Sequence, residues 1–521
     1  MPFWTDDVLA SADLARPHIL NDSKTPSGRV HVGALRGVLI HDAIRQALAE
    51  RGVAATFLYG VDDYDPLDEL PAGLEDFYRP YLGQPLCNVP APEGSSASDI
   101  AEHYIGEFFD VLADLHVVAE KYRMRDVYRS GRFDTAIDRI LRAGEDVREI
   151  YLRVSGSERP PGWLPFQVIC PVCGRVGTTT VGGYDGETVA YECHPHLVTW
   201  AQGCGSTGRV SPFSGNGKLP WKLEWTAKWA VFGVSIEGAG KDHTSRGGSR
   251  DVAVACLQRI FGLEPPLNVP YEWFLVGGAK MSSSKGVGVS AREVADLLPA
   301  DVLRFLLMRT RPRSTVDFEP TEEAIVKLFS DFDKCRAEAV RDPESTYGKI
   351  YRLATDEPPG YWAPAMALVF ALEQLPHVDV DAKVAALKGT PLTPGEAHHL
   401  AARRRVARHW LDHFAGPEDK LELHGHLPAD AENLTAGQSR VLADLAERLG
   451  TVAWTAEAVQ DAIFTTARED GVEARDAFEA IYRVFFARRS GPRAGSVLSF
   501  LDPEFVRERL LDAAAACGRL S

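Results

Sequence analysis

Residues 16–52 read RPHILNDSKTPSGRVHVGALRGVLIHDAIRQALAERG and predict a strand, a glycine-bearing turn and a helix. RPHILN is the strand, and apolar residues from Leu35 and Leu39 to Ile44 and Leu48 recur at helical spacing. A second apolar run, AATFLYGV at 54–61, ends in the acidic stretch DDYD. Strand, turn, helix and strand make a βαβ unit, which predicts a doubly wound parallel sheet of the α/β class.

The turn of this unit, TPSGRVHVG at 25–33, is suited to binding an anion. A helix N-terminus offers unpaired N–H groups and the positive end of the helix dipole, and glycine lets the backbone approach a ligand closely. His31 stands just before the helix, where its ring can donate a hydrogen bond to a phosphate oxygen. The alternative is a histidine that caps the helix or packs in the core, so a second phosphate-binding element is needed.

A candidate for that second element is FLVGGAKMSSSKGVGVS at 274–290. One short segment contains Lys280, Lys285, three serines and several glycines, and we call it the lysine loop. This composition is typical of a mobile loop that closes over a polyphosphate. A solvated surface turn has a similar composition. The presence of His31 and its glycine-bearing turn far upstream favours the polyphosphate interpretation.

Composition narrows the class of protein. A chain of 521 residues is too long for one ordinary core, so we expect several domains. The content of 45% hydrophobic and 25% charged residues describes a globular protein, and no apolar run has transmembrane length. The acidic N-terminal sequence lacks the basic start and apolar stretch of a signal peptide, so we expect a cytoplasmic protein. The net charge of −16 argues against a general nucleic-acid coat, although local basic tracks remain compatible with it.

Eight cysteines are too sparse for a disulfide scaffold, and four of them lie close together in CPVCGRV…YECHPHLVTWAQGCG. Cys170 and Cys173 form a CxxC knuckle, and Cys193 with Cys204 completes a tetrahedral thiolate set for zinc. Such a site would fold an insertion that is poor in core residues. His196 competes with Cys204 as the fourth ligand, and buried free thiols are the alternative to a metal.

The two phosphate elements resemble the signature pair of class I aminoacyl-tRNA synthetases, His-x-Gly-His and Lys-Met-Ser-Lys-Ser. Five segments narrow the resemblance to the class I lysyl-tRNA synthetases, the archaeal-type family that is also found in some bacteria. In order along the chain they are TPSGRVHVG, DDYDP, GNGKLPWKLEW, GKDHTSRGGS and KMSSSKG. The resemblance runs over nearly the whole chain and includes the tail ARRSGPRAGSVLSFL.

The resemblance implies a Rossmann-like class I synthetase catalytic domain with a zinc-bearing insertion, followed by an all-α C-terminal anticodon-binding domain. Capping boxes that begin at Thr393 and Thr435 favour helices in the last part. The expected divisions are the first half of the catalytic domain at 1–85, the insertion with the cysteines at 86–215, the second half with the lysine loop at 216–320, and the anticodon-binding region at 321–521.

The implied activity is the ATP-dependent attachment of L-lysine to tRNA-Lys through a lysyl-adenylate. Mg²⁺ is expected with ATP and zinc in a structural role, and we expect a monomer that binds no membrane. The implied catalytic residues are His31, Lys280 and Lys285. The implied ATP-binding residues are Pro26, Ser27, Gly28, Val32, Gly33, Ala34, Met281, Ser282, Ser283 and Ser284.

For the amino acid, the resemblance points to a second set of residues, which are Ser23, Thr25, Trp221, His243 and Tyr271. An ammonium group also needs a carboxylate, for which the sequence leaves Asp62, Glu224 and Asp242 open. The aromatic residues are ordinary core residues in the alternative interpretation, and Asp242 pairs with Lys241 at the surface.

The chain departs from the family pattern at three positions. Ala34 replaces the last histidine of His-x-Gly-His, Ser283 replaces a loop lysine, and Ser23 stands where many members have glycine. With these changes, Lys280 and Lys285 are the side chains expected to neutralise the phosphate charge. Some relatives have a further metal site beside a histidine such as His103, but the preceding PEGSSASDIAE has no cysteine or histidine, so we expect no metal there.

Two basic tracks in the last part, ARRRVARHW and YRVFFARRSGPR, indicate contacts with tRNA. Trp410 or Phe486 would stack on an unpaired base, and solvated helix faces are the alternative. The expected tRNA-binding residues are Arg403, Arg404, Arg408, Arg488, Arg489 and Arg493.

Three other functions remain open: a small-molecule nucleotidyltransferase, a relative that activates lysine for another acceptor, and a non-catalytic RNA-binding relative. Within the synthetases, glutamate or arginine specificity is the remaining alternative.

Overall fold

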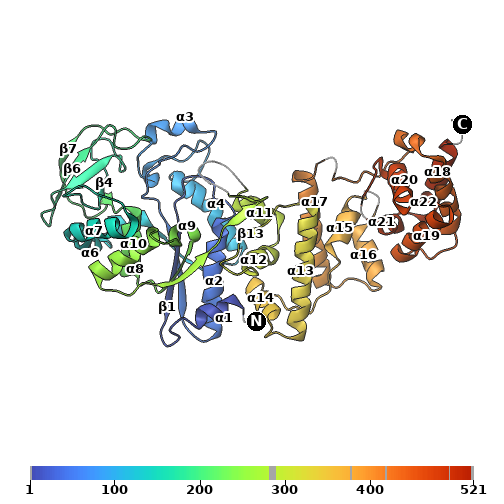
Figure 1. Cartoon of the computed structure of the whole chain (residues 1–521), viewed down its shortest axis with the longest axis horizontal. Coiled ribbons are helices and arrows are strands. Elements are labelled where there is room, and N and C mark those ends of the chain that lie inside the picture. The colour runs from blue at the N-terminus through green and yellow to red at the C-terminus, as the bar shows by residue number, and fades with distance from the viewer. Residues whose placement is uncertain (1–2, 281–288, 376–377, 417–418, 492, 518–521) are drawn as a thin grey trace. The chain divides into compact units, whose positions relative to one another are not determined.

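A computed structural model describes residues 3–280, 289–375, 378–416, 419–491 and 493–517. The chain divides into two compact units (Figure 1). The first unit comprises Met1–Glu319 with Lys334–Pro359, and the second comprises Pro320–Asp333 with Gly360–Ser521. The segment 334–359, which follows the expected boundary near residue 320, therefore packs with the first unit.

A parallel sheet of five strands forms the core of the first unit, in the order β10-β9-β1-β2-β3. Its strands are β1 (His18–Lys24), β2 (Ala55–Val61), β3 (Glu120–Arg123), β9 (Ile236–Gly240) and β10 (Leu267–Tyr271). The predicted βαβ unit is confirmed, because β1 and β2 pair in parallel on either side of α2 (Ala34–Glu50). The chain runs outward from β1 in both directions, so the β1–β9 border is the topological switch point where open α/β sheets bind ligands.

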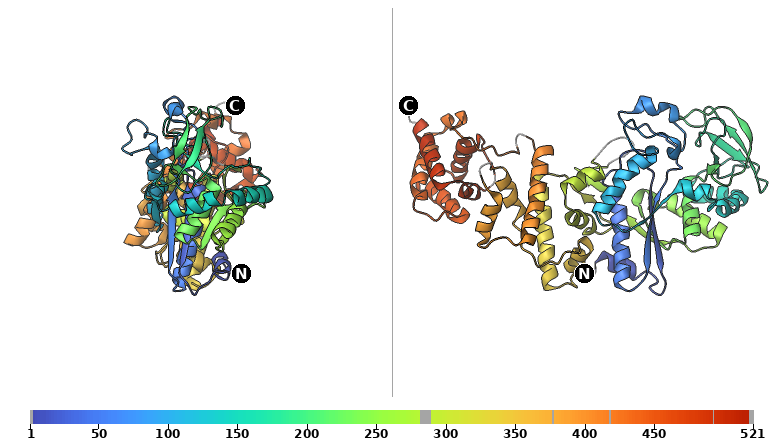
Figure 2. Two further views of the ribbon diagram at one scale, coloured as in Figure 1. Left: turned by 90° about the vertical axis from the view of Figure 1, so that its left-hand side faces the viewer. Right: turned by 180° about the vertical axis from the view of Figure 1, so that it is seen from behind.

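Helix α2 lies along the sheet (Figure 2). Most of its residues are buried. Apolar residues fill its contact with β1 and β2, and two charged side chains fix its outer side. Arg36 donates hydrogen bonds to the Thr310 and Arg311 carbonyls at 3.0 and 2.9 Å. Asp42 pairs with Arg304 of α12 (Ala300–Met308) at 2.7 Å. These contacts fix the start of α2, and with it the turn that precedes the helix.

The cysteine module is a separate small β structure within the first unit. It contains an antiparallel sheet of β5 (Thr179–Gly182), β6 (Val189–Cys193) and β7 (Thr207–Val210), and a pair of β4 (Gln167–Val168) and β8 (Gly217–Lys218). The predicted insertion, 86–215, also contains β3, which pairs with β2 in the core sheet. The core therefore continues past residue 86 before the cysteine module begins.

The remaining elements of the first unit surround these sheets. Helices before and after the cysteine module are α1 (Trp4–Leu9), α3 (Glu75–Tyr78), α4 (Ile100–Asp114), α5 (Met124–Arg129), α6 (Asp134–Arg142), α7 (Gly144–Ser155), α8 (Trp221–Phe232), α9 (Lys241–Thr244) and α10 (Ser249–Cys256). The elements that follow β10 are β11 (Phe274–Val276), β12 (Ala279–Lys280), α11 (Ala291–Leu297), β13 (Val316–Asp317) and α14 (Thr346–Ala354).

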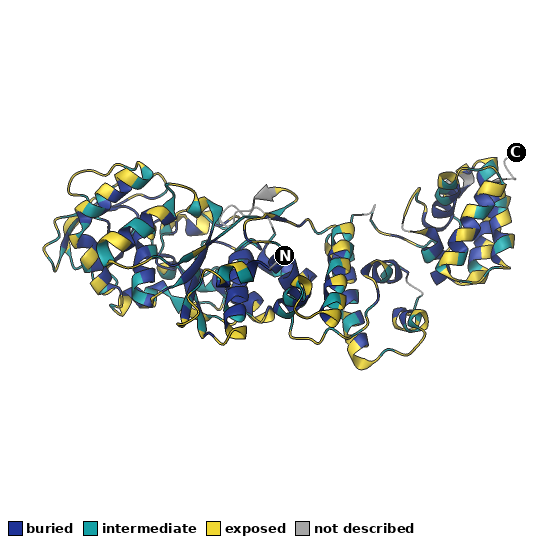
Figure 3. Cartoon of the chain, turned by 60° about the horizontal axis from the view of Figure 1, so that its bottom comes forward, coloured by how far each residue is buried: buried dark blue, intermediate teal, exposed yellow. Residues whose placement is uncertain are grey.

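The described part of the second unit contains helices and no strand. Helix α13 (Glu322–Arg341) starts in this unit and ends in the first. The later helices are α15 (Met366–Glu373), α16 (Val380–Lys388), α17 (Pro394–His413), α18 (Ala436–Leu449), α19 (Ala456–Glu469), α20 (Ala474–Phe486), α21 (Ala494–Phe500) and α22 (Pro503–Cys517). The capping boxes at Thr393 and Thr435 are confirmed, and the apolar faces of these helices turn inward (Figure 3). Across the described residues, no helix is both long enough and apolar enough to cross a bilayer.

Candidate active site

The glycine-bearing turn and the segment after the lysine loop are joined by backbone pairing. The Val32 amide donates to the Val289 carbonyl at 3.1 Å, and the Ala291 amide donates to the Val30 carbonyl at 2.9 Å. His31 and Ser290 form the β-bridge between these two bonds. The two sequence elements predicted to hold phosphate therefore meet in the fold.

The described residues on either side of the lysine loop belong to a paired strand and to a capped helix. β12 pairs antiparallel with β11, with Leu275 opposite Lys280. Ser290 caps α11 by accepting from the Glu293 amide at 3.1 Å. Met281, Ser282, Ser283, Ser284 and Lys285 lie outside the described residues, and so does the side chain of Lys280.

The turn between β1 and α2 carries the other predicted ATP-binding residues. Pro26, Gly28 and Val32 are buried, whereas Ser27, Gly33 and Ala34 are partly open. Gly33 is the N-cap residue of α2 and supplies no capping side chain. The partly open residues therefore form the accessible side of this turn.

Two predicted lysine-binding residues, Ser23 and Thr25, donate to carboxylates at the end of β2. The Ser23 hydroxyl donates to Asp62 at 2.8 Å, and the Thr25 hydroxyl donates to Asp65 at 2.7 Å. Behind them, Lys228 pairs with Asp62 at 2.5 Å and Lys218 pairs with Asp65. Glu224 lies 3.3 Å from Lys218 and 3.7 Å from Lys228. We call Asp62, Asp65, Glu224, Lys218 and Lys228 the ion cluster.

Electrostatics within the ion cluster favour ionised lysines. Burial lowers the pKa of Lys218 and Lys228, but the adjacent carboxylates outweigh it and raise both values. Burial raises the pKa of Glu224, and the two lysines only partly oppose this. For Asp65, burial is outweighed by Lys218 and the pKa is lowered.

Trp221 and His243 form an open aromatic wall. Their ring centroids are 5.3 Å apart, and Trp221 also stacks on Trp225 at 5.9 Å. Trp221 is 44% exposed, which excludes the alternative of an ordinary core residue. Asp242 and His243 are both exposed on α9, and Lys241 pairs with Glu272 at 2.6 Å.

Tyr271 lies at the end of β10 and faces α2. A Cβ atom at Gly37 would lie 2.6 Å from the Tyr271 hydroxyl and 2.7 Å from the Asp22 carboxylate, so glycine is required there. Burial raises the pKa of Asp22 to about 7. The Tyr271 hydroxyl and the Asp22 carboxylate thus both lie beside Gly37.

Four members of this region were not predicted from the sequence, namely Asp22, Asp65, Lys218 and Lys228. The signal for the first was its place beside Ser23 at the C-terminal end of a strand, where α/β sheets bind ligands. Asp65 belongs to the quoted motif DDYDP, but nothing in that motif identifies its lysine partner. The lysines come from β8 and α8, far along the chain.

Four cysteine side chains gather in the β module as predicted. The ligand atoms of Cys170, Cys173, Cys193 and Cys204 all lie within 4.8 Å of one another. Two of the sulfur pairs are 3.6 and 3.7 Å apart, close to the separation of about 3.8 Å in a tetrahedral site with Zn–S bonds of about 2.3 Å. The donors therefore fit zinc, and His196 does not join them in the described part of the chain.

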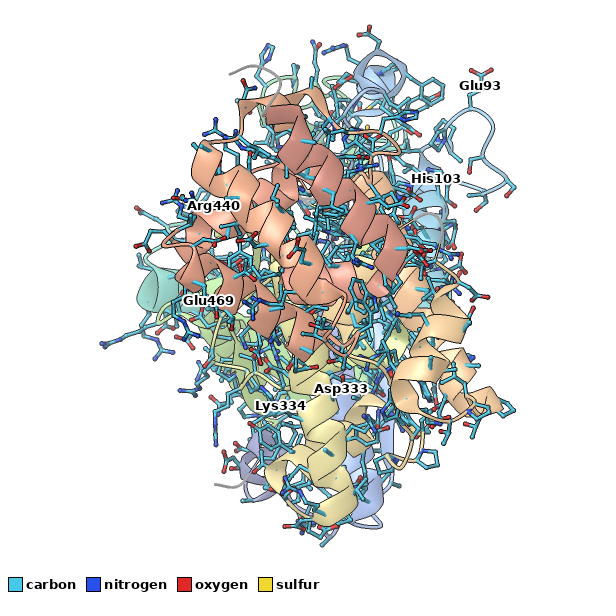
Figure 4. All side chains as sticks on the ribbon, turned by 90° about the vertical axis from the view of Figure 1, so that its right-hand side faces the viewer. Glu93, His103, Asp333, Lys334, Arg440 and Glu469 are labelled. Atoms are coloured by element: carbon cyan, nitrogen blue, oxygen red, sulfur yellow. The ribbon has the colours of Figure 1, made fainter. Side chains whose placement is uncertain are left out.

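The position of His103 gives this residue a local partner. Its Nδ1 lies 2.9 Å from the Ser95 hydroxyl, on the loop before α4 (His103 is labelled in Figure 4). The expectation that no metal binds there stays a prediction.

The arginines of the first basic track are held by acidic partners in the second unit. Arg403 is 4% exposed, pairs with Asp333 at 2.6 Å and donates to the Pro364 carbonyl at 2.6 Å (Asp333 is labelled in Figure 4). Arg404 and Arg408 both pair with Glu373. The assignment of Arg403 to RNA binding is thus corrected, because its guanidinium is buried in an ion pair.

The two aromatic residues named as base-stacking candidates are also buried. Trp410 and Phe486 are each 3% exposed, and the Trp410 indole donates to the Pro320 carbonyl at 2.6 Å. Neither ring is open to a base, so this expectation is corrected too. Apolar spacing on their helices explains the burial, since each ring faces the interior of the unit.

The second basic track lines a cavity of about 620 Å³ between α19, α20 and the following segment. Arg489 and Arg493 contribute to its wall and are exposed, whereas Arg488 is half-buried and donates to the Lys420 carbonyl at 3.1 Å. Phe478 and Tyr482 supply aromatic surface. The cavity thus combines cationic and aromatic groups.

The sheet, its switch point and the two joined loops define a nucleotide-binding catalytic domain of Rossmann type. Comparison with known proteins specifies it further. Residues 6–356 match the family model described as tRNA synthetases class I (K). This chain belongs to that family.

Curated relatives match over nearly the full length. The lysine--tRNA ligase of Archaeoglobus fulgidus is 31% identical over 513 residues, covering 97% of this chain and 99% of the relative. The lysine--tRNA ligase of Thermoplasma acidophilum is 31% identical over 515 residues, with 98% of each chain covered. Among solved structures, a glutamate tRNA ligase from Elizabethkingia meningosepticum covers 96% of this chain and 99% of its own, with 12% identity and a TM-score of 0.42.

Proposed function

We propose that this protein attaches L-lysine to tRNA-Lys in two steps and serves translation in the cytoplasm. The observation that carries the proposal is the pairing of Val30–Val32 with Val289–Ala291, which joins the two phosphate elements at the switch point. Membership of the class I (K) synthetases and the names of the relatives support the same activity.

In the first step, a carboxylate oxygen of lysine forms a bond to the α-phosphorus of ATP. The bond from that phosphorus to its bridging oxygen breaks, and pyrophosphate leaves. His31 and the backbone beside Gly33 serve one side of the triphosphate, and Lys280, Ser282 and Lys285 serve the other. The protein acts mainly by positioning and by neutralising charge that develops on phosphate oxygens.

In the second step, a ribose hydroxyl at the tRNA terminus attacks the lysyl carbonyl carbon, and AMP leaves. Mg²⁺ accompanies ATP and screens the triphosphate charge. The four cysteines would hold zinc in a structural role, because four protein ligands would leave no position open for a substrate. Arg489 and Arg493, with the aromatic surface beside them, support a tRNA-binding role for the cavity of the second unit.

The test is amino-acid-dependent exchange of pyrophosphate into ATP, with each amino acid and with or without total tRNA. We expect exchange with lysine alone. Exchange with a different amino acid would retain the fold and refute the specificity. Exchange without transfer to tRNA would indicate another acceptor, and the absence of exchange in every mixture would refute the catalytic function.

A further inference from the structure

The ion cluster contains more carboxylates than ammonium groups. Its acids are Asp62, Asp65 and Glu224, and its cations are Lys218 and Lys228. Each aspartate has one lysine, while Glu224 shares both lysines at 3.3 and 3.7 Å. With all five groups ionised, the cluster has one uncompensated negative charge in a buried setting, which is strongly unfavourable.

Hydroxyl groups surround the three acids without changing this balance. Ser23 and Thr25 donate to the two aspartates, and the Tyr128 hydroxyl donates to Glu224 at 2.6 Å. A hydroxyl stabilises a carboxylate but brings no positive charge. The missing charge must therefore come from a proton or from a bound cation.

The neighbouring titratable groups do not supply it. Burial raises the pKa of Asp22 of β1 to about 7 and lowers the pKa of Lys24 beside it. Tyr122 of β3 is a neutral phenol whose pKa is raised by burial. Glu237 of β9 accepts from Asn21 and the Trp225 indole, both at 2.8 Å. Among the described residues, Lys218 and Lys228 are thus the cations in direct contact with the three acids.

Exposure shows from which side a cation enters. The side chains of Asp62 and Asp65 are 15% and 20% exposed, whereas Lys218, Lys228 and Glu224 are 2–4% exposed. The two lysines thus lie on the inner side of the ion cluster. The carboxylates of Asp62 and Asp65 lie on its more exposed side, beside Ser23 and Thr25. An incoming ammonium group meets carboxylates first.

We propose that Glu224 holds a proton in the free protein, and that an ammonium group of the amino acid displaces it by binding at the outer edges of Asp62 and Asp65. This inference rests on the proposed function and concerns its amino-acid site. The proton on the Glu224 carboxyl passes to water, the ammonium group keeps its three hydrogens, and the cluster stays neutral. The raised pKa of Glu224 agrees with this state of the free protein.

The first experiment measures the heat of L-lysine binding to the full chain at pH 7 in phosphate and in Tris buffer. These buffers differ in ionisation enthalpy, so the difference in heat counts the protons released. We expect release of roughly 0.5–1 proton per lysine bound. Lysine binding with equal heats in both buffers would overturn the inference and leave the proposed function intact, whereas absence of both lysine binding and lysine-dependent exchange would refute the proposed function as well.

Variants identify the source of the proton. Glutamine carries no proton to release, so the cluster of Glu224→Gln is neutral before lysine binds. We therefore expect no proton release, and we expect lysine affinity to fall about tenfold because the bound ammonium would leave a net positive charge. Asp22→Asn removes a neighbouring acid whose pKa is also raised and should leave the release in place, as should Glu69→Gln on the exposed part of the loop that follows β2. Release that persists in Glu224→Gln, or disappears in Asp22→Asn, would overturn the assignment to Glu224. The wild-type buffer comparison remains decisive if a variant fails to fold.

The ammonium group has two sources on lysine, and two analogues separate them. Norleucine retains only the α-ammonium, and 6-aminohexanoate retains only the terminal ammonium. The analogue that carries the group bound by the cluster should release the proton, and the other should not. Binding of both analogues without release would contradict the inference.

Discussion

The amide of Val32 donates a hydrogen bond to the carbonyl of Val289, across 3.1 Å and nearly half the length of the chain. This bond ties the turn before α2 to the first described residue after the lysine loop. Both lie at the switch point of the parallel sheet, where the elements on either side of a ligand are brought together. The relationship predicts that catalysis depends on the pairing itself as well as on the side chains.

Ala291→Pro tests that dependence. Ala291 is the first residue of α11, where proline is well tolerated, but its amide is the donor to Val30. We expect the lysine-dependent exchange rate to fall about tenfold, because misplaced phosphate-binding groups lose much of their effect. Ala436→Pro, at the first residue of α18, is the matched control and should retain the rate. Equal rates in both variants would show that the pairing does not contribute.

The proposed zinc site predicts a difference between Cys204→Ala and His196→Ala. Wild type and His196→Ala should contain about one zinc per chain by atomic absorption, whereas Cys204→Ala loses most of it. Loss of zinc should expose the module to proteolysis, since the metal contributes on the order of 10 kcal/mol to folding such a site. Full zinc content in Cys204→Ala would contradict the assignment of the fourth ligand.

For tRNA, the structure separates arginines that look equivalent in the sequence. Substituting Arg489 and Arg493 with alanine should raise the KM for tRNA about tenfold and leave lysine-dependent exchange unchanged. Arg403→Ala should instead lower the thermal midpoint, because it removes the buried Arg403–Asp333 ion pair. An increase in the tRNA KM for Arg403→Ala alone, at unchanged stability, would reverse this assignment.

The raised pKa of Asp22 predicts a pH-dependent stability. Its pKa is about 7 in the folded chain and about 4 when unfolded, so the unfolded state loses the proton first as pH rises. Stability is therefore lost between pH 4 and pH 7, and Asp22→Asn removes this loss. Relative to wild type, the variant should gain about 2.5 kcal/mol between pH 5 and pH 8. Thermal unfolding at both pH values measures it, and a constant difference would refute it.

The sequence was sufficient for the local elements of the fold. The βαβ unit and the capping boxes are specified by residues within one or two turns of each other, and all were confirmed. β3 was not foreseen because it is a short, charged edge strand, EKYR, without the alternation of a half-buried strand. Its place is specified by pairing with β2.

Non-local charge pairing limited the prediction of the site. A run such as ARRRVARHW shows that several arginines are close, but not that Arg403 turns inward to Asp333. In the same way, GNGKLPWKLEW identified the segment with Lys218 and Glu224, but not their position behind Asp62 and Asp65. Both arrangements follow from the packing of distant segments, which periodicity does not report.

Strand β1 pairs with β9, where Leu20 lies opposite Ile236. Because these strands are far apart in the sequence, the sheet is completed late during synthesis. Ribosomes add about 5–20 residues per second, so β1 waits roughly 10–40 s before its central neighbour is made. During that interval one edge of β1 has no strand beside it, and the cysteine module is produced before the sheet can close. If the four cysteines bind zinc as proposed, the nascent chain needs that metal before its sheet is complete, and the apolar edge of β1 needs protection from aggregation in the same interval.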